Sequence, residues 1–79
     1  MIEVSPHARL KMAAKGISEE EIKDCIREGT LIAKQVVDSE SRYAKCLELK
    51  DKKIVVVYVF RKGITRVITC YPIHKKKTW

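Results

Sequence analysis

Apolar side chains follow two different periods along the chain. Up to residue 29 they recur at a helical spacing, and from residue 31 onward they alternate with polar ones. Ser5 followed by Pro6, and Ser18 with Glu21 three residues later, are typical starts of helices, and a glycine ends each segment. These signals predict two helices, over residues 6–15 and 18–28.

The second half of the chain predicts strands. β-branched residues dominate four runs separated by short turns, over residues 31–37, 42–49, 53–60 and 64–71. Short turns make neighbouring strands antiparallel, and the third run, apolar on both faces, is expected at the centre. The predicted fold is therefore α+β, with two N-terminal helices on one face of a four-stranded antiparallel sheet. The opposite face is free for a ligand.

Alternation assigns side chains to the two faces of that sheet. In the second run, alternation places Tyr43, Lys45, Leu47 and Leu49 on one face of the sheet. The two leucines favour this face as the one that packs against the helices. In the fourth run, strict alternation groups Ile64, Ile68 and Cys70 in one set and Thr65, Val67, Thr69 and Tyr71 in the other. Arg66 interrupts the apolar set, either as a snorkelling side chain or as a functional one.

Length and composition narrow the class of protein. A chain of 79 residues supports a single domain over residues 1–79, and its basic end, residues 74–79, is expected to be mobile. No apolar run is long enough for a membrane helix, so a cytoplasmic protein is expected. Three widely spaced cysteines indicate neither disulfides nor a metal site, and no cofactor motif is present. The absence of Asn beside abundant Lys, Glu, Ile and Val is typical of heat-adapted proteins.

Positive charge is concentrated in the predicted sheet. Residues 1–40 carry six basic and eight acidic side chains, whereas residues 41–79 carry eleven basic and two acidic ones. A one-sided basic surface is typical of proteins that bind RNA or another polyanion, although lysines on exposed strands also keep small proteins soluble. The five aromatic residues are too scattered along the sequence to predict a base-stacking surface.

The candidate catalytic residues are His7, Thr69 and Tyr71. The positive end of the first helix disfavours an imidazolium at His7, which favours a neutral ring able to act as a general base towards a ribose 2′-hydroxyl. Thr69 and Tyr71 supply hydroxyls on the last strand, and His74 is a second proton carrier. Such cleavage needs no metal, only cations on the phosphate, and four side chains are candidates for that role: Arg42, Lys45, Arg61 and Arg66. The alternative is a His7 with a purely local role.

Three motifs in this order resemble domain-of-unknown-function family 4258: SPHA at residues 5–8, KGISEEEI at 15–22 and ITCYP at 68–72. Lys11 and Lys15 stand where that family commonly has arginines. The family in turn is similar to the RelE/ParE-type toxin ribonucleases. This resemblance implies a RelE-like fold, an active site near His7, Thr69 and Tyr71, and a small acidic antitoxin as a partner.

Two hypotheses of function follow. The first is a toxin-like RNA endonuclease that acts without metal, with His7 in proton transfer and sheet arginines and lysines on phosphate. The second is a non-catalytic module of the same fold that binds RNA or a protein, because one fold hosts many functions.

Overall fold

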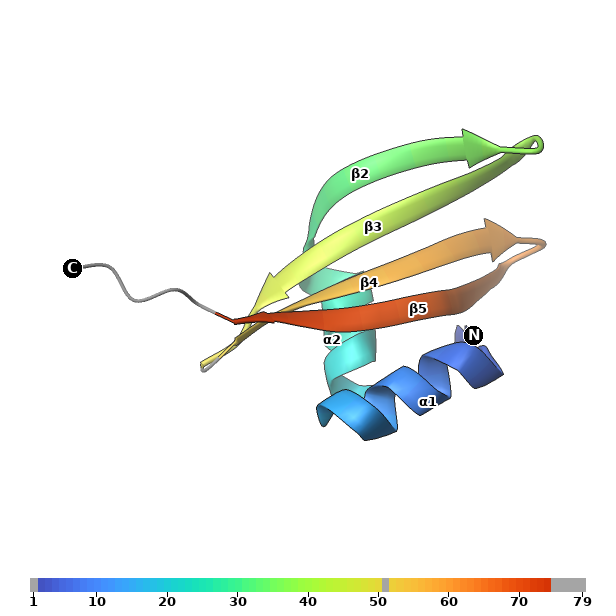
Figure 1. Ribbon diagram of the computed structural model, residues 1–79. Helices are drawn as coiled ribbons and strands as arrows, with labels where there is room; N and C mark the ends of the chain where they lie inside the picture. The colour runs from blue at the N-terminus through green and yellow to red at the C-terminus, as the bar shows by residue number, and fades with distance from the viewer. Residues whose placement is uncertain (1, 51, 75–79) are drawn as a thin grey trace.

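The computed structural model describes residues 2–50 and 52–74, without the side chain of His74. Its elements follow the order β1 (Ile2–Val4), α1 (Pro6–Lys15), α2 (Glu19–Glu28), β2 (Thr30–Val37), β3 (Glu40–Glu48), β4 (Lys52–Arg61) and β5 (Ile64–His74). Both helices lie against one face of a twisted sheet (Figure 1), so the α+β prediction is confirmed. The expected mobile tail beyond His74 lies outside the described residues. No helix in the described part of the chain is long and apolar enough to cross a membrane.

The two helices begin at the caps that the sequence predicts. Ser5 Oγ accepts a hydrogen bond from the Ala8 N–H at 3.1 Å, and Ser18 and Glu21 form a reciprocal capping box. Three glutamates in the first turn of α2 also complement the helix dipole. Gly16 ends α1 in the left-handed conformation, which a residue without Cβ adopts at little cost.

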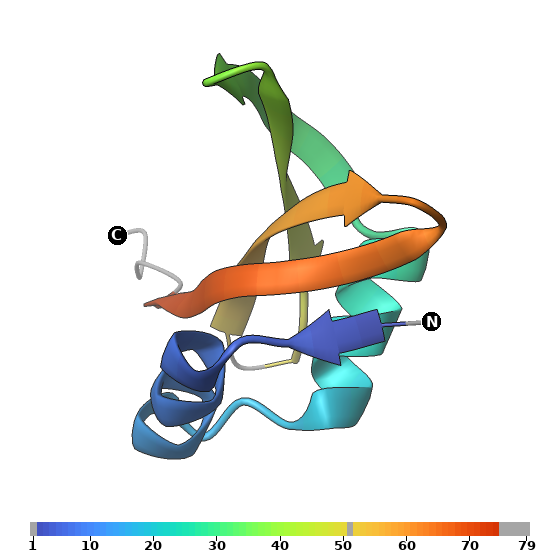
Figure 2. The same ribbon diagram turned by 90° about the vertical axis from the view of Figure 1, so that its right-hand side faces the viewer.

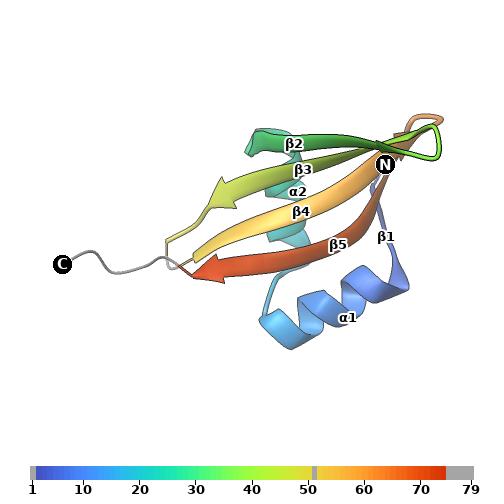
Figure 3. The ribbon, with the colours of Figure 1, turned by 45° about the horizontal axis from the view of Figure 1, so that its top comes forward.

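The sheet has five strands rather than four, and it is mixed rather than wholly antiparallel. Its strand order is β1-β5-β4-β3-β2, which confirms the central position of β4. The additional strand, β1, lies beside β5 (Figures 2 and 3) and pairs with it in parallel. The register places Ile2 beside Thr65 and Val4 beside Val67. Three residues are too few to show an alternating pattern, and their partner lies at the other end of the sequence, so the prediction of four antiparallel strands was wrong.

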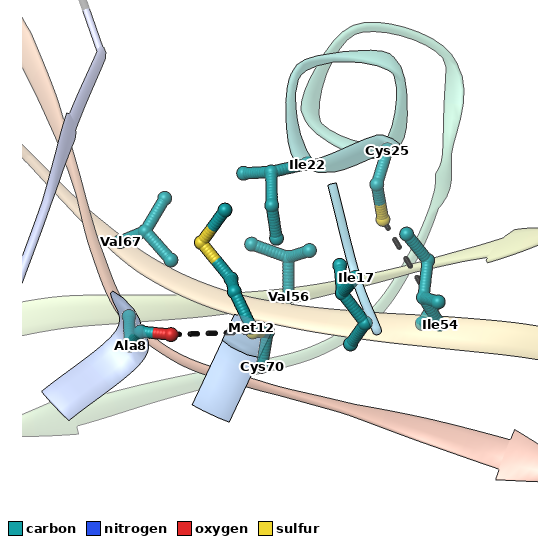
Figure 4. Close-up of a cluster of buried hydrophobic side chains, with 9 residues drawn as sticks. All are labelled: Ala8, Met12, Ile17, Ile22, Cys25, Ile54, Val56, Val67 and Cys70. Carbon is teal, nitrogen blue, oxygen red and sulfur yellow. Dashed lines mark hydrogen bonds between the residues drawn. The ribbon is translucent and has the colours of Figure 1, made fainter. Parts of the chain in front are cut away.

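The core lies between the helices and β4 and β5. Its fully buried members include Ile22 and Cys25 from α2, and Ile54 and Val56 from β4 (Figure 4). Leu47 and Leu49 pack against this cluster, which confirms the predicted inward set of β3. Burying such aliphatic side chains contributes about 1.5–3 kcal/mol each, the main term that stabilises so small a domain.

A β-bulge in β5 changes the faces predicted by strict alternation. Thr69 pairs with Val57 and Val67 pairs with Tyr58, so Ile68 is an extra residue between them. Val67 therefore joins the helix-facing core, whereas Ile64 and Arg66 lie on the helix-free face with Thr69 and Tyr71. The expectation that Val67 shares a face with Thr69 and Tyr71 was wrong, and so was the grouping of Ile64 and Arg66 with Cys70. The Ile68 carbonyl accepts a hydrogen bond from Ser5 Oγ at 3.0 Å, so the bulge joins the start of α1 to the sheet.

The sheet divides at one end into two hairpins. Pairing between β3 and β4 ends at Arg42 and Val59. The β2–β3 pairing continues to Val37 and Glu40, and the β4–β5 pairing continues to Arg61 and Ile64. Figure 2 shows the β2–β3 hairpin rising away from the β4–β5 hairpin. We call this opening the fork.

Candidate functional site

A row of polar side chains crosses the helix-free face of the sheet at the root of the fork. The strand registers place Glu3, Arg66, Val59, Arg42 and Gln35 side by side across all five strands. Val59 belongs to the face opposite the core residues Ile54 and Val56, because alternate residues of a strand point to opposite faces. Arg42 and Arg66 therefore lie two strands apart on the free face, or about 10 Å from backbone to backbone.

Arg42 has an unsatisfied polar atom. Its Nε is buried and lacks a hydrogen-bond partner among the described residues. Leaving a buried donor unpaired costs about 1–3 kcal/mol, and more for a charged group. A bound anion that accepted this hydrogen bond would remove that cost.

A hollow of about 370 Å³ lies beside this row, which we call the arginine hollow. It is lined by Glu3, Val59, Arg61, Lys62, Ile64 and Arg66. Arg66 Nη1 donates to Glu3 Oε1 at 3.4 Å, and both side chains remain about half exposed. Arg61 is paired with Glu40 across the fork. The three cations outnumber the single carboxylate that lines the hollow, so an anion is the ligand it suits.

Thr69 and Tyr71 share the helix-free face with these arginines. Thr69 pairs with Val57, and Tyr71 pairs with Val55, whereas the core-facing residue between them, Cys70, contacts α1 through the Ala8 carbonyl. Tyr71 is 44% exposed, so its phenol is open to a ligand. The structure thus brings together five of the predicted site residues on one face.

Lys45 lies on the opposite side of the sheet. Its Nζ donates to the Ile26 carbonyl at 2.6 Å, in the last turn of α2, where the negative end of the helix dipole favours a cation. This position separates Lys45 from the three arginines and gives it a role in joining α2 to β3. The same leucine set that correctly predicted the inward face of β3 contains Lys45, so its orientation was readable from the sequence.

His7 lies in the first turn of α1 and is exposed. Its ring makes no polar contact with the other described residues, and Glu3, the nearby carboxylate, is paired with Arg66 instead. The helix that carries His7 packs against β5, the strand that carries Arg66, Thr69 and Tyr71. The catalytic role of His7 stays a prediction.

The structure gathers aromatic side chains that appear scattered in the sequence. The rings of Tyr43 and Tyr58 stack with centroids 5.6 Å apart, and Lys34 Nζ lies 5.7 Å from the Tyr43 centroid. Burial, followed by the neighbouring Tyr43, raises the pKa of Tyr58 above its ordinary value of 10.0, so its phenol stays neutral at physiological pH. This contact follows from the antiparallel register of β3 and β4, which places Tyr43 beside Tyr58.

A second hollow, of about 500 Å³, lies in the fork, and we call it the fork hollow. It is lined by the β2–β3 turn (residues 38–41) together with Tyr43, Phe60 and Arg61. Asp38 and Ser39 both have positive φ, 50° and 65°, as a tight two-residue hairpin turn requires. Arg61 lines both hollows, which are therefore neighbours.

The described residues offer neither a cluster of metal ligands nor an activated thiol at Cys25 or Cys70. They contain no group of three or more His, Cys, Asp or Glu side chains that could hold a metal ion. Burial, with a smaller contribution from Cys46, raises the pKa of the Cys25 thiol from 9.0 to about 11. Burial also raises the pKa of Cys70. Both thiols are protonated at neutral pH and act as small apolar residues of the core.

The chain matches a known protein family. The family described as "Domain of unknown function (DUF4258)" matches residues 4–72, which is most of the chain. No curated protein and no solved structure shows a significant match.

Proposed function

The chain belongs to the DUF4258 family, and we propose that this member binds RNA on the helix-free face of its sheet. The observation that carries the proposal is the pair Arg42 and Arg66 in one row across the sheet, with a buried, unpartnered Nε on Arg42. Guanidinium groups bind phosphate through two parallel hydrogen bonds, and a phosphate oxygen would satisfy the orphaned donor.

The surroundings of this row support RNA rather than a small anion. Arg61 and Lys62 extend the positive surface to the end of the β4–β5 hairpin, so several successive phosphates meet a cation. Thr69 and Tyr71 supply hydroxyls that can bond a ribose 2′-hydroxyl, the group that distinguishes RNA from DNA.

Binding of a labelled single-stranded RNA, measured by fluorescence anisotropy, tests the proposal. Arg42→Ala and Arg66→Ala are expected to weaken binding by about tenfold each, since hydrogen bonds to charged groups contribute about 1.5–3 kcal/mol. Arg27→Ala is the matched control, because Arg27 is an exposed arginine of α2 paired with Asp24. Equal losses in all three variants would mean that only the net charge matters and would contradict a site on the free face.

Metal-independent RNA cleavage is the second candidate function. It is favoured by the shared face of Thr69, Tyr71 and the arginines, and by an exposed His7 ring on the helix that packs against the same strand. In this proposal His7 removes the proton of the 2′-hydroxyl, and the arginines stabilise the charge that develops on the phosphate. The resemblance to RelE-like ribonucleases, which use basic and tyrosine side chains of the sheet, supports the same assignment.

Incubation of labelled RNA with the protein in the presence of a chelator separates the two functions. A cleaving enzyme is expected to lose about a hundredfold or more of its rate in His7→Ala while its RNA affinity stays unchanged. Tyr71→Phe tests the phenol in the same assay. RNA that is retained but intact would leave binding as the function and remove His7 from it.

A further inference from the structure

The fork hollow combines three kinds of side chain that recognise one chemical group. Phe60 is 59% exposed, although it belongs to the central strand β4. Tyr43 borders the same hollow and is held in position by stacking on Tyr58. The exposed ring of Phe60 offers a stacking surface for a planar ring, and the partly buried Tyr43 borders the same hollow.

The rim of the hollow supplies hydrogen-bond acceptors. The β2–β3 turn contributes the carboxylate of Asp38 and the hydroxyls of Ser39 and Ser41, while the Glu40 carboxylate is occupied by Arg61. Asp38 forms no ion pair with the other described residues. The serine hydroxyls can both donate and accept, whereas the Asp38 carboxylate only accepts, so a planar ring with an N–H donor on its edge fits the part of the rim at Asp38.

Arg61 connects the fork hollow to the arginine hollow, because its side chain lines both. Phe60 and Tyr43 belong to the helix-facing sets of β4 and β3, so a chain whose phosphate lies in the arginine hollow would pass its neighbouring unit through the opening between the two hairpins. In single-stranded RNA that neighbouring unit is a nucleotide with an unpaired base.

From these observations we propose that the fork hollow binds one unpaired nucleobase, stacked on Phe60 and Tyr43, and prefers a base with an exocyclic amino group that donates to Asp38. This inference rests on the proposed RNA binding and deepens it, because it makes single-stranded RNA with exposed bases the substrate class. A carboxylate that accepts from the cytosine amino group is a known mode of base recognition.

Three oligonucleotides of one length test the inference: oligocytidylate, oligouridylate and an abasic oligomer with the same backbone. All carry the unmodified ribose that Thr69 and Tyr71 are proposed to contact. Each titration is repeated with His7→Ala, and gel electrophoresis checks that the RNA is still intact. In anisotropy titrations the wild-type protein is expected to bind oligocytidylate about tenfold more tightly than the abasic oligomer. Oligouridylate is expected to bind about tenfold more weakly than oligocytidylate.

Variants assign each preference to its residue. Phe60→Ala is expected to lower the affinity for oligocytidylate about tenfold and to leave the abasic oligomer unaffected. Leu10→Ala is the matched control, since Leu10 is a large apolar residue of α1 that is 72% exposed and lines neither hollow. Asp38→Asn keeps the shape and tolerates the positive φ, and it is expected to abolish the preference for cytosine over uracil.

The outcomes separate this inference from the proposed function. If the abasic oligomer binds as tightly as oligocytidylate, phosphate binding stands and the base subsite is wrong. If Phe60→Ala and Leu10→Ala weaken oligocytidylate equally, the aromatic assignment is wrong. If no oligomer binds, RNA binding itself fails and the base subsite fails with it.

Discussion

Ser5 connects two elements with one hydroxyl. Its Oγ accepts from the Ala8 N–H at the start of α1 and donates to the Ile68 carbonyl in the β5 bulge. Ser5→Ala is expected to lower the free energy of unfolding by about 2 kcal/mol, the sum of a lost helix cap and an unpaired carbonyl. The measurement is urea denaturation followed by circular dichroism.

Ser18→Ala is the control for Ser5→Ala. Ser18 also caps a helix, but its side chain bonds only within its own capping box. We therefore expect a loss of about 1 kcal/mol for Ser18→Ala. Equal losses for the two serines would show that the bond to the bulge contributes nothing to stability.

Because of Cys25, the free energy of unfolding is expected to change with pH in the alkaline range. Its pKa is about 11 in the folded protein against an ordinary value of 9.0, so between these values the unfolded chain loses a proton that the folded one keeps. The free energy of unfolding is then expected to fall as pH rises through this window, and to be fully retained below it. Urea midpoints measured on both sides of pH 9.0 check the direction.

Cys25→Ala identifies the residue responsible for that dependence. Cys70 and Tyr58 have pKa values raised in the same direction, so part of the fall should persist in the variant. The slope against pH should nevertheless be smaller than in the wild type. An unchanged slope would assign the whole effect to the other two groups.

At the scale of elements, Gly29 lets the end of α2 lie close to the backbone of β3, because it has no Cβ. A Cβ at this position would clash with the Cys25 carbonyl and lie 3.0 Å from the Cys46 carbonyl, and both of these atoms belong to backbone. Gly29→Ala is therefore expected to cost about 3 kcal/mol or more, the upper end of typical overpacking. The measured quantity is again the urea midpoint.

Gly16→Ala provides the comparison. Gly16 has a φ of +67° but nothing within 4 Å of an added Cβ, so only the left-handed backbone resists the substitution. A loss of about 1–2 kcal/mol is expected there. If Gly16→Ala proved the more damaging change, the close contact of α2 with β3 would be of little importance.

Most of the elements could be predicted from local signals, and the errors have one origin. Caps and glycines mark α1 and α2, and period-two runs mark β2 to β5, because these signals lie within the element itself. β1 and the bulge at Ile68 depend on contacts between the two ends of the chain, which no local pattern encodes. The bulge also decides which face Val67 and Thr69 occupy.

Which site residues share a face of the sheet could be predicted only where side chains alternate regularly between the two faces. Thr69 and Tyr71 share the free face as alternation requires, and Arg42 joins them through the register of β3 with β4. Strict alternation places Arg66 with Cys70 on the other face, and only the bulge at Ile68 brings Arg66 to the free face. The fork and its aromatic rings were not predicted, because they depend on where pairing between β3 and β4 ends. The end of pairing is a property of two strands together, and the hydrophobic pattern of either strand alone does not encode it.

At the scale of the whole molecule, the excess positive charge predicts a strong effect of salt. RNA affinity is expected to fall steeply as salt rises from about 50 to about 200 mM, since each neutralised phosphate releases condensed counterions. The slope of log affinity against log salt should decrease in magnitude by about 0.7 in Arg66→Ala, one contact on a single strand. A slope near zero in the wild type would contradict phosphate binding.

The parallel pair of β1 and β5 also determines when the protein can fold. Glu3 meets Arg66, and Ser5 meets Ile68, each across 63 residues of chain. During synthesis the first strand and the first helix leave the ribosome long before the strand on which they dock exists. The core therefore closes only after nearly all described residues have been made, and until then the apolar face of α1 is exposed to chaperones and proteases.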